Sequence, residues 1–135
     1  MLKKIGIVIG IVVLIAVIGF GILMFRLAGM ANKLEAENDK IGGYNLLQIK
    51  DGTYVGQAGD FVVSAKVQVT VKGRKIREIK ILEQKCGPGY EARDTINRII
   101  KAQSPKVDAV TGASSSSRSI MNAVDQALKS SQSSK

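Results

Sequence analysis

The chain has 135 residues, of which 20 are Lys or Arg and 11 are Asp or Glu, so its net charge is +9. It has no His and one Cys, Cys86. The lack of His excludes His-based catalytic triads and His-containing metal sites. A single Cys excludes an intrachain disulfide, a CxxC redox motif and an iron–sulfur cluster. Any redox chemistry of this chain would therefore need an organic cofactor.

An uncharged apolar run extends from Ile5 to Phe25. As a helix it would be about 31 Å long, which matches a hydrocarbon core of about 30 Å. Lys3 and Lys4 precede the run, and positive charge before a spanning helix favours a cytoplasmic N-terminus. We therefore expect residues 1–30 to be a membrane anchor, with the rest of the chain outside the cytoplasm.

A cleaved signal peptide is the alternative, because residues 27–31 contain the small side chains that such a cleavage site uses. The apolar run is longer than the 7–15 residues of a signal h-region, which favours an anchor that stays in place.

The remaining residues are enough for one small domain. Residues 31–43 are polar and indicate a linker, and residues 44–129 form the predicted domain. Residues 130–135 are a polar tail with nothing to bury, which we expect to be disordered.

Strand patterns come first in this domain. A short strand is predicted at 52–56, and apolar residues alternate with polar ones from Val63 to Val71, as in a half-buried strand. The sequence 72–74, Lys-Gly-Arg, predicts a turn into a further strand at 76–82, in which Ile79 and Ile81 share a face.

Two helices follow, because the apolar spacing changes to that of a helix. The first is predicted to end near Ala102, and the second to contain Ile120, Val124 and Leu128. Hairpin-linked strands followed by helices predict an α+β domain, with a small antiparallel sheet covered on one face by both helices.

The segment 107–118 joins these helices with small and hydroxyl residues and leads into the N-terminus of the last helix. Such an N-terminus favours an anion such as phosphate. Gly112 and Ala113 would let the anion approach the backbone, and Arg118 lies one turn further on. The alternative is structural: the serines cap the helix and Asp108 closes a turn.

Residues 108–114, Asp-Ala-Val-Thr-Gly-Ala-Ser, resemble the flavinylation motif Asp-x-x-(Ser/Thr)-Gly-Ala-(Thr/Ser) of the FMN-binding domain family. That family includes flavin-bearing components of the sodium-translocating NADH:quinone reductase and of the Rnf complex. The resemblance extends to Gly52-x-Tyr54-x-Gly56 and to Gly87-Pro88-Gly89-Tyr90.

The resemblance implies that Ser114 carries FMN through a phosphoester made by a dedicated flavin transferase. Asp108, Thr111, Gly112 and Ala113 would be the other motif positions that this enzyme reads. Ser114 stands where the family usually has Thr, so Ser115 or Ser116 is an alternative acceptor.

The flavin ring needs an apolar or aromatic bed, for which the loop containing Gly87, Gly89 and Tyr90 is the first candidate and Tyr54 the second. The alternative for Tyr90 is an ordinary residue packed on the sheet. Cys86 precedes this loop, and we expect it to be buried and inert. The alternatives are a bond with another chain and a position next to the flavin.

These observations predict a membrane-anchored extracytoplasmic flavoprotein that transfers electrons between a membrane donor and another carrier or a reductase. It would have no catalytic residues and no metal site of its own. The alternatives are a cofactor-free basic module that binds an envelope polymer or a partner protein, and a flavin-bearing subunit of an ion-translocating complex. The basic domain could attract anionic lipid, cell-wall polymer or an acidic redox partner. Nucleic acid fits poorly outside the membrane.

Overall fold

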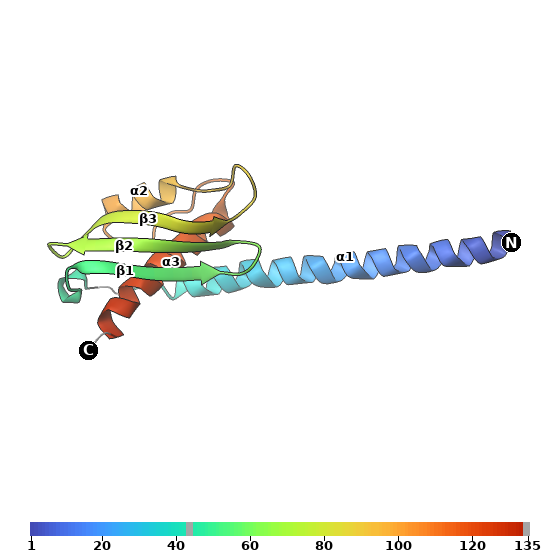
Figure 1. Cartoon of the computed structure of the whole chain (residues 1–135), viewed down its shortest axis with the longest axis horizontal. Coiled ribbons are helices and arrows are strands. Elements are labelled where there is room, and N and C mark those ends of the chain that lie inside the picture. The colour runs from blue at the N-terminus through green and yellow to red at the C-terminus, as the bar shows by residue number, and fades with distance from the viewer. Residues whose placement is uncertain (43–44, 134–135) are drawn as a thin grey trace. The chain divides into compact units, whose positions relative to one another are not determined.

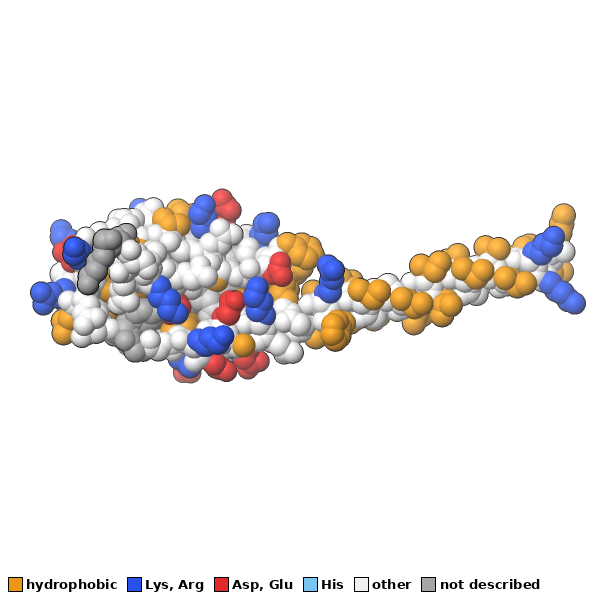
Figure 2. Space-filling model, turned by 90° about the horizontal axis from the view of Figure 1, so that it is seen from below, with side chains coloured by type: hydrophobic (Ala, Val, Ile, Leu, Met, Phe, Trp, Pro, Cys, Tyr) orange, Lys and Arg blue, Asp and Glu red, His pale blue; other side chains and the backbone are white. Residues whose placement is uncertain are grey.

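The computed structural model describes residues 1–42 and 45–133 and consists of two compact units, Met1–Asn32 and Lys33–Lys135. Helix α1, Leu2–Asp39, makes up the first unit and continues into the second. Its apolar side chains are exposed along the first unit, as Figure 2 shows. Among the described helices, α1 alone is long and apolar enough to cross a membrane, which is consistent with the predicted anchor.

The second unit contains a three-stranded antiparallel sheet and two helices (Figure 1). A short 3₁₀ helix, Leu46–Gln48, comes before the sheet. The strands, in spatial order, are β1 (Gly52–Gly59), β2 (Ser64–Lys72) and β3 (Lys75–Lys85), and the helices are α2 (Asp94–Ala102) and α3 (Ser114–Ser133). Helix α3 packs on β1 and β2, and α2 lies against α3 and β3. The predicted α+β class is confirmed.

The hairpin between β2 and β3 turns at Gly73 and Arg74, which both have positive φ, as in a type I′ turn. The Asp51 carboxylate accepts hydrogen bonds from the backbone N–H groups of Gly73, at 3.0 Å, and Arg74, at 3.3 Å. These bonds favour the ionised carboxylate and so lower the pKa of Asp51. A local hydrogen-bond network therefore supports this end of the sheet.

The core lies between the sheet and α3, where Val67 and Val69 of β2 face Ile120 and Val124. An irregularity in β3 leaves Arg77 and Glu78 both exposed, so Ile76 and Ile79 are buried on the same face and Ile81 is half-buried.

Gly56 lies where α3 comes closest to the sheet. A Cβ atom there would overlap the backbone oxygen of Ala123 and the backbone nitrogen of Ala127. Only glycine permits this approach of the helix to β1.

The segment expected to be a linker is partly packed. Helix α1 extends through Asp39, Leu34 is buried, and the Leu34 carbonyl accepts a hydrogen bond of 3.1 Å from the Asn122 side chain. At the other end α3 continues to Ser133, so residues 130–133 of the expected tail are helical. The predicted start of the domain at Tyr44, the last linker residue, 43, and residues 134–135 lie outside the described residues.

Candidate functional site

The motif segment turns sharply immediately before α3. The Ala113 N–H donates to the Val110 carbonyl at 3.0 Å, and Gly112, the third residue of this turn, has a φ of 81°. These are the features of a type II turn, which requires positive φ at its third position. A Cβ on Gly112 would meet nothing within 4 Å, so the glycine is needed for its backbone conformation rather than for space. Thr111 and Gly112 are exposed at the surface.

The four serines of the run differ in exposure. Ser114 is the first residue of α3 and is exposed, whereas Ser115 is half-buried. Ser116 and Ser117 are buried, at 3% and 0% exposure. Access therefore favours Ser114 over the alternative acceptor Ser116.

Ser117 holds the motif turn onto the helix. Its Oγ accepts a hydrogen bond from the Val110 N–H at 2.9 Å and donates one to the Ala113 carbonyl at 2.8 Å. Ala113 is buried, and its carbonyl also accepts from the Ser117 N–H at 2.9 Å. A serine inside the helix thus stabilises the turn. The sequence did not predict this role, because a run of four serines does not indicate which of them faces inward.

Arg98 of α2 holds the start of the motif. This role, too, was not predicted from the sequence. Its Nη1 donates to the backbone carbonyls of Asp108, at 3.1 Å, and Ala109, at 3.3 Å, while its Nε pairs with Asp94 at 2.8 Å. The spacing of Asp94 and Arg98 predicts the ion pair. Nothing in the sequence indicates the contacts with the motif, because they join separate segments. The Asp108 residue itself is exposed.

Arg118 follows Ser114 by four residues, on the same face of α3. Its Nη2 pairs with Glu35 of α1 at 3.3 Å. This ion pair uses only part of the donor capacity of the guanidinium group. The structure thus places Arg118 beside the start of α3, with Glu35 as its partner.

The loop expected to hold the flavin ring is a second turn with positive φ. The Tyr90 N–H donates to the Gly87 carbonyl at 3.1 Å, and Gly89 has a φ of 83°. Tyr90 is 54% exposed, so it is not a core residue packed on the sheet, and its ring lies beside Gly87. The Gln84 side chain donates to the Glu91 carbonyl at 2.7 Å and ties the loop to β3.

Tyr54, the second candidate for the ring bed, lies elsewhere. Its hydroxyl donates to the Lys50 carbonyl at 2.8 Å, and it follows Gly52, which pairs with Val71 beside the β2–β3 turn. The opposite end of β1, at Gly59, is five residues further, about 17 Å along a strand. Gly59 pairs with Ser64, and Ser64 pairs with Lys85, the last residue of β3. The loop with Tyr90 follows Lys85, so it begins at the end of the sheet opposite to Tyr54.

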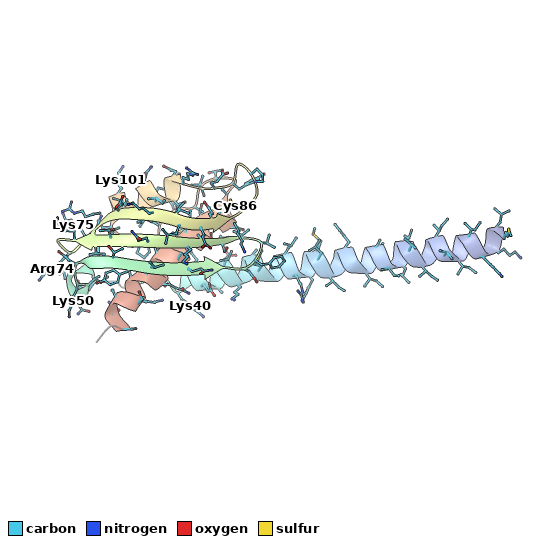
Figure 3. All side chains as sticks on the ribbon, viewed as in Figure 1. Lys40, Lys50, Arg74, Lys75, Cys86 and Lys101 are labelled. Carbon is cyan, nitrogen blue, oxygen red and sulfur yellow. The ribbon has the colours of Figure 1, made fainter. Side chains whose placement is uncertain are left out.

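Cys86 is half-buried rather than fully buried, contrary to the expectation. With Pro88, Arg93 and Ile96 it lines a cavity of about 690 Å³ beside the last residues of β3. Figure 3 shows Cys86 at this end of the strand. In Figure 1 the loop after β3 and the first turn of α3 lie toward the same end of the sheet.

The first turn of α3 has the features that an attached phosphodiester needs. Ser114 is exposed, the neighbouring motif residues are small, and the first turn contains no acidic residue. The first N–H groups of a helix have no acceptor within the helix, and the helix dipole favours an anion at this end. These residues therefore fit a phosphate-linked flavin.

Comparison with known protein families gives a match within the second unit. The model of the family described as the FMN-binding domain matches residues 62–129, half of the chain. The match includes β2, β3, α2 and the motif turn, whereas the pattern from Gly52 to Gly56 lies outside it. No curated protein matches the chain. Since the family model matches half of its residues, the chain belongs to the FMN-binding domain family.

Proposed function

We propose that this chain is a membrane-anchored extracytoplasmic flavoprotein that carries FMN through a phosphoester on Ser114. It transfers electrons between a membrane donor and another carrier or a reductase. The observation that carries the proposal is the exposed Ser114 hydroxyl at the start of α3, within the motif of an FMN-binding domain.

The choice of Ser114 rests on access and on hydrogen bonding. An enzyme that modifies the chain must reach the acceptor hydroxyl, and Ser116 and Ser117 are buried. The Ser117 hydroxyl is also occupied, since it accepts from Val110 and donates to Ala113. Ser115 is half-buried and one helical position away from the motif serine. Ser114 is the serine that combines exposure with the motif position.

The attachment is a phosphoryl transfer without a redox change. Esterification by FMN itself would require loss of water in an aqueous medium, so the donor must contain an activated phosphate, such as the anhydride of FAD. The Ser114 Oγ forms a bond to the flavin-side phosphorus, the anhydride P–O bond breaks, and AMP leaves. The hydroxyl proton passes to a base of the transferase.

The chain's own residues then position the product. The N-terminus of α3 interacts favourably with the single negative charge of the phosphodiester, and Arg118 is near enough in sequence to add a charge-assisted contact. The attached FMN supplies the electron-accepting and electron-donating chemistry. A covalent bond also keeps the cofactor from diffusing away outside the cell.

The anchoring part of the proposal rests on α1. Its first unit is apolar and exposed, and the lysines that precede the apolar run favour a cytoplasmic N-terminus. The domain that begins at Lys33 would then lie on the outer side, where a tethered carrier can meet membrane-bound partners.

Coexpression of the full chain with a flavin transferase tests the proposal. We expect the intact mass to increase by one FMN less one water and the purified protein to be yellow. Ser114→Ala should abolish the added mass, whereas the matched control Ser115→Ala should keep it. An unmodified wild-type chain, or an adduct that persists in Ser114→Ala, would contradict the proposal.

A further inference from the structure

A cationic groove borders the flavinylation motif. It has a volume of about 750 Å³ and is lined by Arg98, Lys101, Ala102, Lys106, Val107 and Asp108. Three of these residues are cations and one is an acid. The groove extends from the C-terminal half of α2 to the first residue of the motif, so it is continuous with the segment that leads to Ser114.

The charges of the groove are only partly neutralised within the chain. Arg98 pairs with Asp94. Lys101 and Lys106 are exposed and have no ion pair among residues 1–42 and 45–133. The Arg98 contacts with the Asp108 and Ala109 carbonyls hold the motif backbone against this surface. The groove therefore presents two unpaired ammonium groups next to an ordered recognition segment.

A protein that reads the motif comes close to this groove. Asp108 is a motif position and at the same time part of the groove wall, together with Lys101 and Lys106. Complementary charge at such a contact accelerates association and orients the partner. A partner with carboxylates opposite the groove fits this arrangement.

We propose that the groove is the docking surface for the flavin transferase, which would contact Lys101 and Lys106 through an acidic patch while it modifies Ser114. This inference rests on the proposed function, because it assumes that Ser114 is the acceptor. It adds two residues outside the motif that determine how fast the chain is modified.

The test measures the initial rate of flavin attachment by intact mass, with purified full-length chain in detergent, a flavin transferase and FAD. Lys101→Gln/Lys106→Gln removes both charges, and Lys101→Glu/Lys106→Glu reverses them. The matched control is Lys40→Glu/Lys50→Glu, which changes the net charge equally. Figure 3 shows Lys40 and Lys50 on the β1 side of the sheet, away from Lys101.

At low ionic strength we expect kcat/KM for the wild type and the control to agree within about twofold. The Gln pair should be slower, and the Glu pair slower by about tenfold or more. Added salt should slow the wild type and reduce the difference, because it screens exposed charges. Negative charge at the C-terminal end of α2 would itself destabilise the helix. The Gln pair adds no such charge, so a slower reaction of this variant indicates lost docking and not misfolding.

The outcomes separate the two proposals. If the wild type is modified and the Glu pair reacts at the same rate, the docking surface is wrong and the proposed function stands. If the control slows as much as the Glu pair, the rate depends on the net charge of the chain, and the proposed docking surface is wrong. If the wild type is never modified, both proposals fail together.

Discussion

The first turn of α3 and its middle are built in opposite ways. At the first turn, Ser114 is exposed, and a Cβ on neighbouring Gly112 would meet no atom within 4 Å. In the middle, Ala123 and Ala127 are fully buried, and α3 lies so close to β1 that a Cβ on Gly56 would overlap its backbone. One helix therefore combines an open end with a closely packed middle.

The difference shows how a small domain can expose a serine hydroxyl without losing order. The packed middle sets the position of the helix, and the inward Ser117 ties the motif turn to it. Ser114 can then remain accessible on a rigid element, which suits a site that an enzyme must recognise. The first two of the following predictions each change one side of this comparison, and the last two test contacts elsewhere in the domain.

The largest expected effect is on the packed middle. Gly56→Ala should lower the free energy of unfolding by about 3 kcal/mol or more, because the added methyl overlaps the backbone of α3. Urea denaturation of the full chain in detergent, followed by pulse proteolysis, measures this. Gly112→Ala is the matched control, with open space but positive φ, and should cost about 1 kcal/mol. Equal costs for the two variants would contradict the comparison.

The next effect distinguishes the inner serine from the outer one. Ser117→Ala removes the acceptor of the partly buried Val110 N–H and should cost about 1–3 kcal/mol of stability. Ser114→Ala should change stability by less than about 0.5 kcal/mol, because the residue is exposed. The same denaturation assay compares them. A stability loss in Ser114→Ala as large as that in Ser117→Ala would mean that both serines are structural.

A third prediction concerns a buried hydroxyl that lacks hydrogen-bond partners. Among the described residues, the Oγ1 atom of Thr95 in α2 is buried without a partner. Thr95→Val keeps the branched shape and should raise the free energy of unfolding by about 1 kcal/mol. Destabilisation instead would show that this hydroxyl, like that of Ser117, stabilises the fold through a hydrogen bond.

The smallest effect is at the other end of the sheet, where Asp51 supports the β2–β3 turn. Its pKa is lower in the folded chain, so its contribution is complete above the ordinary pKa of 3.8 and decreases as the pH falls through the folded pKa. Wild type should therefore be more stable than Asp51→Asn at pH 7, and the difference should disappear in acid. A difference that does not change with pH would contradict this assignment.

Repeated local patterns predicted most of the fold. The alternation from Val63 to Val71, the Lys-Gly-Arg turn and the helical spacing after residue 92 specify the hairpin and both helices, because burial on one face imposes those periods. The turn at Gly112 and the exposure of Ser114 agree with the motif. That these residues hold a flavin stays a prediction.

Contacts between distant segments could not be predicted in this way. Leu34 is in a stretch that has the composition of a linker, and its burial depends on α3, more than eighty residues later. Arg98 has an ordinary i,i+4 partner in Asp94, which conceals its second role at the Asp108 carbonyl. The roles of these residues depend on the packing of the folded domain, which no local pattern encodes.

Localisation of the flavin at single-residue resolution tests the central claim most directly. The wild-type chain, modified by a flavin transferase, is digested, and the peptide spanning the motif is sequenced by fragment-ion mass spectrometry. We predict that the fragments place the whole flavin phosphate on Ser114, with Ser115, Ser116 and Ser117 unmodified. An adduct on one of those three serines, or a motif peptide without flavin, would contradict the account.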